Sequence, residues 1–253
     1  MPKIISIHSF RRGTGKSTIA ANLAVLLAVR GLRVCIIDTD VLSPSLHWRF
    51  GLSGADIDGS LNDFLLDHRP IEQAAHDLTS RLGPGVKGQL FLVPASDDVM
   101  QLARILHEHY DTDRLHDGCQ RLIDQLALDV LLVDTHAGLN QDSLASIAIS
   151  DALIVVLRLE QQDYQGTAVT IDVARQFKVP ELVLIANLVP GNFEPHAVAA
   201  QLEKTYHCPV SAVVPASDEL MTHSNSSPFV LAHAQHPVTL LLTQAANGLA
   251  PHR

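Results

Sequence analysis

The sequence predicts an α/β fold in which a mostly parallel, twisted sheet carries helices on both of its faces. Three observations lead to this prediction: short apolar segments recur along the chain, segments with a helical pattern separate them, and no long linker or internal repeat interrupts the alternation. Parallel strands need a crossover connection, usually a helix, and they are apolar throughout because both faces of such a sheet are covered. The length of 253 residues suits one domain that spans residues 1–253.

Seven segments are expected to form strands, because each is a short apolar run bounded by polar, glycine or proline residues. The second and the fourth of these runs each end in an aspartate. The expected strands are 3–8, 33–38, 88–94, 129–134, 152–157, 182–187 and 209–215.

The segments between these strands are long enough for helices and show apolar residues at helical spacing. The expected helices are 17–30, 101–110, 115–126, 143–149, 164–177 and 195–206. Residues 41–88 are rich in glycine, proline, serine and aspartate. We expect a switch loop there, with a short helix near 61–66 and surface connections, or else plain loop throughout.

The composition is that of a folded globular protein, with 47% hydrophobic and 18% charged residues. A formal net charge of −9 at pH 7 gives no broad positive surface, so DNA binding is not supported. Membrane binding is not supported either. The apolar runs break off well before the ~20 residues that a spanning helix needs, and residues 240–253 lack the basic face of a membrane-surface helix.

Cysteine usage favours a reducing compartment. Cys35, Cys119 and Cys208 form no C-x-x-C pair and no recognisable disulfide framework. The first residues run straight into the first strand without the pattern of a signal peptide. A cytoplasmic location is therefore expected.

A glycine-containing loop at 9–18 joins the first strand to the first helix and is suited to bind phosphate groups. Gly13 and Gly15 allow the backbone to turn so that consecutive N–H groups point inward. The positive end of the following helix and the ammonium group of Lys16 add positive charge. Ser17 supplies a hydroxyl at the position where such loops hold Mg²⁺. This arrangement suits a triphosphate, although a simple helix-capping turn would have a similar sequence.

Carboxylates follow two of the predicted strands. Asp38 and Asp40 come at the end of the second strand, and Asp134 ends the fourth. An apolar run that ends in aspartate is typical of acids that order the water shell of a bound Mg²⁺. Aspartate at a strand end also occurs as a helix cap, but the combination with the loop at 9–18 favours a metal–phosphate site.

Together these segments resemble the MinD/ParA family of deviant Walker A (P-loop) ATPases. The phosphate loop of that family reads K-G-G-x-G-K-[ST]-T and is followed by an A-x-N-L-A-like stretch. The resemblance covers most of the chain, in the segments 11–18, 21–24, 38–40, 44–47, 92–96, 134–138 and 213–215 and at Asn187.

The resemblance implies a P-loop NTPase fold and an ATP-dependent switch that uses ATP and Mg²⁺. Such a protein pairs face to face around two ATP molecules and separates when it hydrolyses ATP. This cycle would position or regulate a cellular cargo, with an unidentified protein partner. Hydrolysis to ADP and phosphate is expected to be slow.

By position in the family pattern, Lys16 would contact the β- and γ-phosphates and Asp40 would orient the attacking water. Ser17 would bind the Mg²⁺, with Asp38 and Asp134 holding its water shell. The nucleotide contacts would be completed by Arg12, Gly13, Thr14, Gly15 and Thr18, by Asn187 reading the adenine, and by the Pro215 segment covering the ring.

One position departs from the common phosphate-loop pattern, and three depart from the family. Phe10 stands where the common phosphate-loop pattern has glycine, and Arg11 replaces the signature lysine that reaches the partner's phosphates. Arginine could still clamp phosphate oxygens, or it could act within its own subunit. Arg12 replaces a glycine at a point of close approach, so we expect altered dimerisation. His136 replaces the usual proline and is either a polar loop residue or a group that touches phosphate or water.

Two other functions are compatible with parts of the sequence. A nucleotide-binding regulatory module with little or no turnover would explain the altered loop. A metal- or iron–sulfur-handling relative would need paired cysteines at a subunit boundary, and the spacing of the three cysteines offers no such pair.

Overall fold

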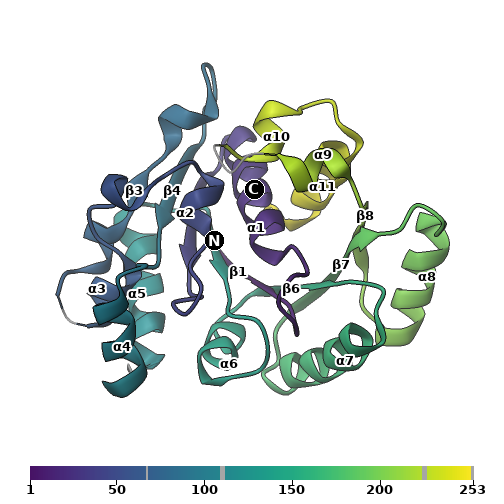
Figure 1. Ribbon diagram of the computed structural model, residues 1–253, viewed down its shortest axis with the longest axis horizontal. Coiled ribbons are helices and arrows are strands. Elements are labelled where there is room, and N and C mark those ends of the chain that lie inside the picture. The colour runs from purple at the N-terminus through teal and green to yellow at the C-terminus, as the bar shows by residue number, and fades with distance from the viewer. Residues whose placement is uncertain (67, 109–111, 224–226, 252–253) are drawn as a thin grey trace.

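One twisted sheet of eight strands runs through the computed structural model, which describes residues 1–66, 68–108, 112–223 and 227–251. The order across the sheet is β3-β4-β2-β5-β1-β6-β7-β8, and neighbours are parallel except for β3 and β4 at one edge. The strands, seen in Figure 1, are β1 Lys3–His8, β2 Arg33–Asp38, β3 His76–Asp77, β4 Gln89–Val93, β5 Val130–Asp134, β6 Ala152–Leu157, β7 Glu181–Val189 and β8 Val210–Pro215.

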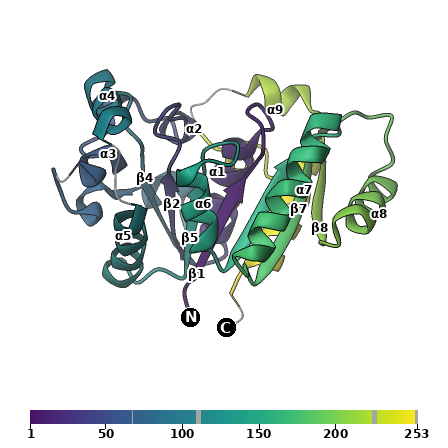
Figure 2. The ribbon, with the colours of Figure 1, turned by 90° about the horizontal axis from the view of Figure 1, so that it is seen from below.

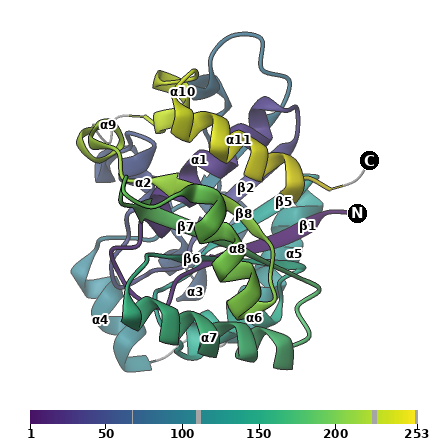
Figure 3. The ribbon, with the colours of Figure 1, turned by 90° about the vertical axis from the view of Figure 1, so that its right-hand side faces the viewer.

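Helices cover both faces of the sheet (Figure 2). Figure 3 shows α1 and α11 on one side and α6 and α7 on the other. The helices are α1 Lys16–Val29, α2 Leu46–Arg49, α3 Leu61–Leu65, α4 Val99–Glu108, α5 Thr112–Gln125, α6 Gln141–Ala148, α7 Gln161–Gln176, α8 Pro195–Tyr206, α9 Asp218–Thr222, α10 Phe229–Ala232 and α11 Pro237–Leu249. Short 3₁₀ turns lie at Gly54–Asp56, Ile71–Ala74 and Thr79–Leu82.

The apolar strands separate two layers of core. Along β1, Ile5 and Ile7 join the cluster that contains α1 and α11, whereas Ile4 belongs to the cluster on the opposite face. This alternation follows from the two-residue period of a strand. Because both faces of the inner strands are buried, every position of β5 and β6 is buried, which explains their unbroken apolar sequences.

The predicted mostly parallel α/β fold is confirmed, and all seven expected strands form with ends shifted by no more than two residues. The edge strand β3 and the helices α2, α9, α10 and α11 were not expected. Of the helix expected at 101–110, the part at 109–110 lies outside the described residues. Within the described part of the chain, no helix combines the length and the apolar character needed to cross a membrane.

The sheet order brings the predicted site together. β5 lies between β2 and β1, and Asp134 at its end is in register with Asp38 of β2 and with Ile7 of β1. The carboxyl ends of parallel strands meet at one edge of a sheet, where ligands bind in such folds. The loop after β1 and the acids of β2 and β5 therefore meet at one place.

Candidate nucleotide-binding site

The loop between β1 and α1 turns at its two glycines. Gly13 and Gly15 have φ angles of 79° and 83°, which place them in the left-handed region. Arg12 does not adopt a positive φ, so its side chain adds no backbone strain of the kind that the loss of a glycine could have caused. Asn187 donates its Nδ2 amide to the carbonyl oxygen of Thr14 at 2.7 Å. A Cβ atom at Gly15 would collide with that amide, so the loop and Asn187 fit closely only with glycine there.

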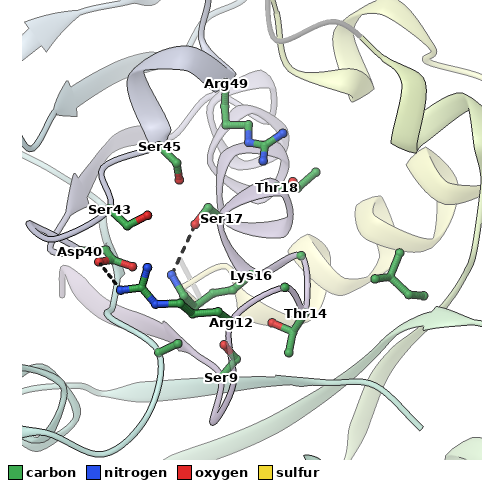
Figure 4. A pocket seen from close by; sticks show the side chains of 14 residues that line it. Ser9, Arg12, Thr14, Lys16, Ser17, Thr18, Asp40, Ser43, Ser45 and Arg49 are labelled. Carbon is green, nitrogen blue, oxygen red and sulfur yellow. Dashed lines mark hydrogen bonds and ion pairs between the residues drawn. The ribbon is translucent and has the colours of Figure 1, made fainter. Parts of the chain in front are cut away.

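A cavity of about 350 Å³ opens above this loop (Figure 4). Eight of the predicted site residues line it: Arg12, Gly13, Thr14, Gly15, Lys16, Ser17, Thr18 and Asp40. The other lining residues had no predicted role in the site, namely Ser9, Ser43, Ser45, Arg49, Ala137 and Leu188. Ser9 lies in the predicted phosphate loop at 9–18, and Ser45 and Ala137 lie in the segments 44–47 and 134–138 that carry the family resemblance, so the sequence pointed to these three positions.

Lys16 and Asp134 form a buried ion pair at the base of the cavity. The Nζ atom of Lys16 lies 2.5 Å from Oδ1 of Asp134, and their side chains are 7% and 0% exposed. The second carboxylate oxygen, Oδ2, is buried and has no hydrogen-bond partner. The ammonium group is thus held at the base of the loop by an acid from β5.

Asp38 shapes the loop that follows β2. Its Oδ1 atom accepts the N–H of Asp40 at 3.1 Å, and its Oδ2 atom accepts the N–H groups of Ser45 and Leu46 at 2.9 and 3.1 Å. Burial, followed by the nearby charge of Asp134, raises the pKa of Asp38 to about 7, and the hydrogen bonds from Leu46 and Ser45 act in the opposite direction. Asp38 therefore fixes the path of residues 40–46, and its contact with a metal's water shell stays a prediction.

Asp40 lies at the rim of the cavity beside two basic groups. Its Oδ1 atom is 3.7 Å from Nη2 of Arg12 and 3.7 Å from Nε2 of His136. Partial burial raises the pKa of Asp40, while His136, Lys16 and Arg12 each lower it. His136 is also 2.8 Å from Nη2 of Arg12, so it belongs to the network around Asp40.

Arg11 points away from the cavity, toward α7. Its Nη1 atom is 3.1 Å from Oε2 of Glu160 and 3.6 Å from Oδ1 of Asp163. The neighbouring Phe10 ring packs against Gly166, where a Cβ atom would collide with it. Arg11 is thus held by two acids of its own chain, and its contact with phosphate oxygens stays a prediction.

Pro215 ends β8, and Asn187 lies two residues before the end of β7. Pro215 pairs with Val189 and is not among the residues that line the cavity. Asn187 is buried and holds Thr14, as described above. Contacts of these two residues with an adenine ring stay predictions.

The donors around the cavity fit a magnesium-bound polyphosphate. The loop offers backbone N–H groups, Lys16 an ammonium group and Ser17 a hydroxyl. Buried polar atoms without partners, Thr14 Oγ1 and Asp134 Oδ2, lie in the same place. Among the described residues no group of three or more His, Cys, Asp or Glu side chains could hold a metal by itself. Mg²⁺ keeps several waters and is usually bound by one or two protein groups plus substrate phosphates, so this donor set suits it.

The three cysteines lie away from the cavity. Cys35, Cys119 and Cys208 are all buried and free. None of them lines the cavity described above. The cytoplasmic location expected from the cysteines stays a prediction.

Comparison with known proteins places the chain among nucleotide-binding proteins. The family model described as an AAA domain (AAA_31) matches residues 2–182. An uncharacterized ATP-binding protein of Methanocaldococcus jannaschii is 28% identical over 246 residues, which is 97% of this chain and 86% of the relative. The chromosome partitioning protein ParA of Myxococcus xanthus is 27% identical over 184 residues, 71% of this chain and 62% of the relative.

The fold is also that of solved structures. The septum site-determining protein MinD of Pyrococcus horikoshii, solved in complex with Mg-ADP, superposes with a TM-score of 0.79. The match covers 98% of this chain and 96% of that chain, with 22% sequence identity. At this identity the likeness concerns the fold alone.

Proposed function

This chain belongs to the AAA domain family and is a MinD/ParA-like ATP-binding protein, and from that premise we propose that it is a nucleotide-dependent switch that slowly hydrolyses ATP. ATPases of this family hydrolyse ATP to ADP and phosphate. The whole chain, residues 1–253, would act as a single P-loop ATPase domain. Its nucleotide state would be read by a protein partner and coupled to the positioning or regulation of a cargo.

The observation that carries the proposal is the arrangement of Lys16, Ser17 and Asp40 around one cavity behind β1. Lys16 supplies a buried positive charge for the β- and γ-phosphates. The two glycines turn backbone N–H groups toward the same space. Asp40 lies at the rim of the same cavity, on the side of Lys16, where a carboxylate can orient a water molecule toward the terminal phosphate.

Magnesium, when bound, neutralises charge that develops on the phosphate oxygens. Ser17 is the residue that would bind it directly, and Asp38 and Asp134 would order its waters. Asn187 and Pro215 would contact the base, and Arg12 and Thr18 would complete the nucleotide contacts. Asn187 also fixes the loop through Thr14, so its effect on binding would combine both roles.

Pairing of two chains around ATP is the finer part of the proposal. Arg11 stands at the position of the family's signature lysine but is held by Glu160 and Asp163 of its own chain. A partner's phosphates would have to compete with these acids for it. We therefore expect a nucleotide-dependent homodimer that is weaker than in relatives with the usual loop. Light scattering with ATP and the Asp40→Ala variant tests this, and Arg11→Lys combined with Arg12→Gly should tighten the dimer.

The retention of Arg11 by α7 also favours a second candidate, a regulatory module that binds nucleotide with little or no turnover. In that case ATP would bind, but phosphate release would be the same in the wild-type protein and in Asp40→Ala. The switch ATPase predicts release that falls in Asp40→Ala while ATP binding persists.

Titration calorimetry with Mg-ATP and Mg-ADP, together with steady-state phosphate release, tests the proposal. We expect heat of binding with the wild-type protein and its loss in Lys16→Ala, since the ammonium group is the main positive charge facing the phosphates. Absence of binding to adenine and guanine triphosphates in the wild-type protein would refute nucleotide binding altogether.

A further inference from the structure

Arg49 is a third cation at the cavity, after Lys16 and Arg12, and it comes from a different element. It is the last residue of α2, whereas the other two belong to the phosphate loop and to the start of α1. Figure 4 shows the guanidinium group of Arg49 directed toward Thr18, while Arg12 lies beside Asp40. The two arginines thus approach the cavity from different sides.

The position of Arg49 is set by the buried face of α2. Leu46 and Phe50 lie four residues apart, on the same side of the helix, and are 0% and 2% exposed in the core that contains α1. Arg49 directly precedes Phe50, so it is turned away from this face by about 100°, the rotation per residue of an α-helix. Its stem can therefore run along the surface of α1 while its charged end reaches the cavity.

Both ends of α2 are held in place. At the start, Asp38 accepts the N–H groups of Ser45 and Leu46. At the end, Nη1 of Arg81 donates to the carbonyl oxygen of Phe50 at 3.0 Å. A short helix fixed in this way presents Arg49 in a restricted region, which reduces the entropy lost when the side chain binds a ligand.

Charge at the cavity also favours a ligand role. Lys16 is paired with Asp134 at 2.5 Å, and Arg12 lies 3.7 Å from Asp40. Asp40 is the one acid among the described lining residues, and Asp134 pairs with Lys16 just behind them, so Lys16, Arg12 and Arg49 exceed these two acids by one positive charge. Burial lowers the pKa of Arg49 and the charge of Asp134 raises it, but an arginine stays protonated at any working pH. A magnesium-bound polyphosphate is negative and complements this excess.

We propose that Arg49 is a nucleotide-binding residue that holds the polyphosphate from α2, on the Thr18 side of the cavity, in ADP and ATP alike. The inference rests on the proposed function and deepens it. Lys16 reaches the β- and γ-phosphates in loops of this type, and Arg12 and Asp40 lie on the Lys16 side. The α- and β-phosphates, which ADP and ATP share, would then lie on the Thr18 side of the cavity. A planar guanidinium group suits this role because it can donate two parallel hydrogen bonds to phosphate oxygens.

Arg49 could take the place of the positive charge that, in the family pattern, the signature lysine of a partner chain supplies. Arg11 is occupied by Glu160 and Asp163. Arg49 supplies a cation from within the same chain, so tight nucleotide binding does not require a second copy. ADP, which the separated chain would hold after hydrolysis, should then bind with an affinity that is independent of protein concentration.

Titration calorimetry with Mg-ADP and Mg-ATP, comparing the wild-type protein with Arg49→Gln, tests the proposal. Losing a charge-assisted hydrogen bond should weaken both nucleotides about tenfold, with the two losses similar. Arg121→Gln is the matched control, because it removes the same charge at an exposed pair with Glu72 outside the cavity. Its affinities should equal those of the wild-type protein.

The outcomes separate the two proposals. Wild-type binding with unchanged affinity of Arg49→Gln for both nucleotides overturns the role of Arg49 and leaves the proposed function standing. A loss for ATP alone overturns the assignment to the shared phosphates. If the wild-type protein binds neither nucleotide, the proposed function fails first. If circular dichroism shows that Arg49→Gln does not fold, Arg49→Lys replaces it, because lysine keeps the charge but lacks the planar guanidinium group. A loss of affinity of about threefold for both nucleotides would then support the proposal, and unchanged affinity would contradict it.

Discussion

Lys16 of the phosphate loop and Asp134 at the end of β5 are joined 2.5 Å apart, and both side chains are almost completely buried. The pair couples the loop to the centre of the sheet. It also keeps two neighbouring acids, Asp38 and Asp134, from facing each other without a cation, since the two lie side by side in the β2–β5 register. Lys16, which we propose to bind the phosphates, therefore also stabilises the nucleotide-free protein.

Replacing Lys16 with methionine should destabilise the nucleotide-free protein by about 3–5 kcal/mol, because Asp134 would remain buried without its partner. Adding Asp134→Asn removes the stranded charge and should recover most of this loss. Urea unfolding of both variants measures the difference. Equal stabilities of the single and the double variant would contradict the prediction.

Replacing Gly15 with alanine should weaken nucleotide binding and lower the free energy of unfolding by roughly 1–2 kcal/mol, because a side chain at φ 83° is strained and its Cβ meets the Asn187 amide. Combining it with Asn187→Ala removes the collision but not the strain, so only part of the stability should return. Gly191→Ala is the control, since nothing lies within 4 Å of its Cβ position. Calorimetry and thermal unfolding are the measurements, and a Gly15→Ala variant as stable as Gly191→Ala would be the contrary result.

The contact between Phe10 and Gly166 predicts a specific rescue. Gly166→Ala should destabilise the protein by about 1–3 kcal/mol, as in other overpacked positions, even though alanine favours the helix. Gly248→Ala lies in α11 with open space around it and should stabilise by about 0.5–1 kcal/mol. Phe10→Ala together with Gly166→Ala should restore stability in thermal unfolding. Failure of this rescue would show that the ring is not what excludes a side chain at 166.

His8 predicts how stability depends on pH. Burial, and then the charges of Lys16 and His136, lower the pKa of His8 from 6.5 to about 3. The neutral ring is thus favoured in the folded protein, and this contribution is complete above pH 6.5 and declines as the pH falls toward about 3.

In His8→Asn, the fall in unfolding free energy below about pH 6.5 should be shallower by up to about 1.4 kcal/mol per pH unit, because one group fewer takes up a proton on unfolding. Asparagine can keep a hydrogen bond at the position of Nδ1, which lies 2.8 Å from Oγ1 of Thr135. Urea unfolding at several pH values between about 6.5 and 4.5 gives the slopes. Parallel slopes for wild-type and variant would argue against a depressed His8 pKa.

Most of the fold was predictable because its signals are local. Buried parallel strands are apolar throughout, and helices between them are long enough to show their period. The helix α11 carried the same signal, since Val238, Leu242, Ala245 and Leu249 are buried at helical spacing. By contrast, the four residues of α2 are too few to show a period, and the two residues of β3 are defined only by their pairing with β4.

The site was predictable where it follows a contiguous motif and not where it depends on distant contacts. The loop residues and Asp40 line one cavity, as the motif indicated. The ion pairs of Arg11 join residues about 150 positions apart in the chain, which no local pattern reveals. Arg49 lies in an irregular segment, and only the folding of α2 over α1 brings it to the cavity.

The central place of β1 has a consequence for the order in which the protein takes shape during its synthesis. Lys3 is in register with Val130, and Ile5 is in register with Ala152. More than half of the chain must therefore be synthesised before β1 can pair with β5 or β6. Pairing between strands so far apart in the sequence slows folding. Nascent chains shorter than this should fail to retain ATP, and their uncovered first strand is the segment that a chaperone would have to shield.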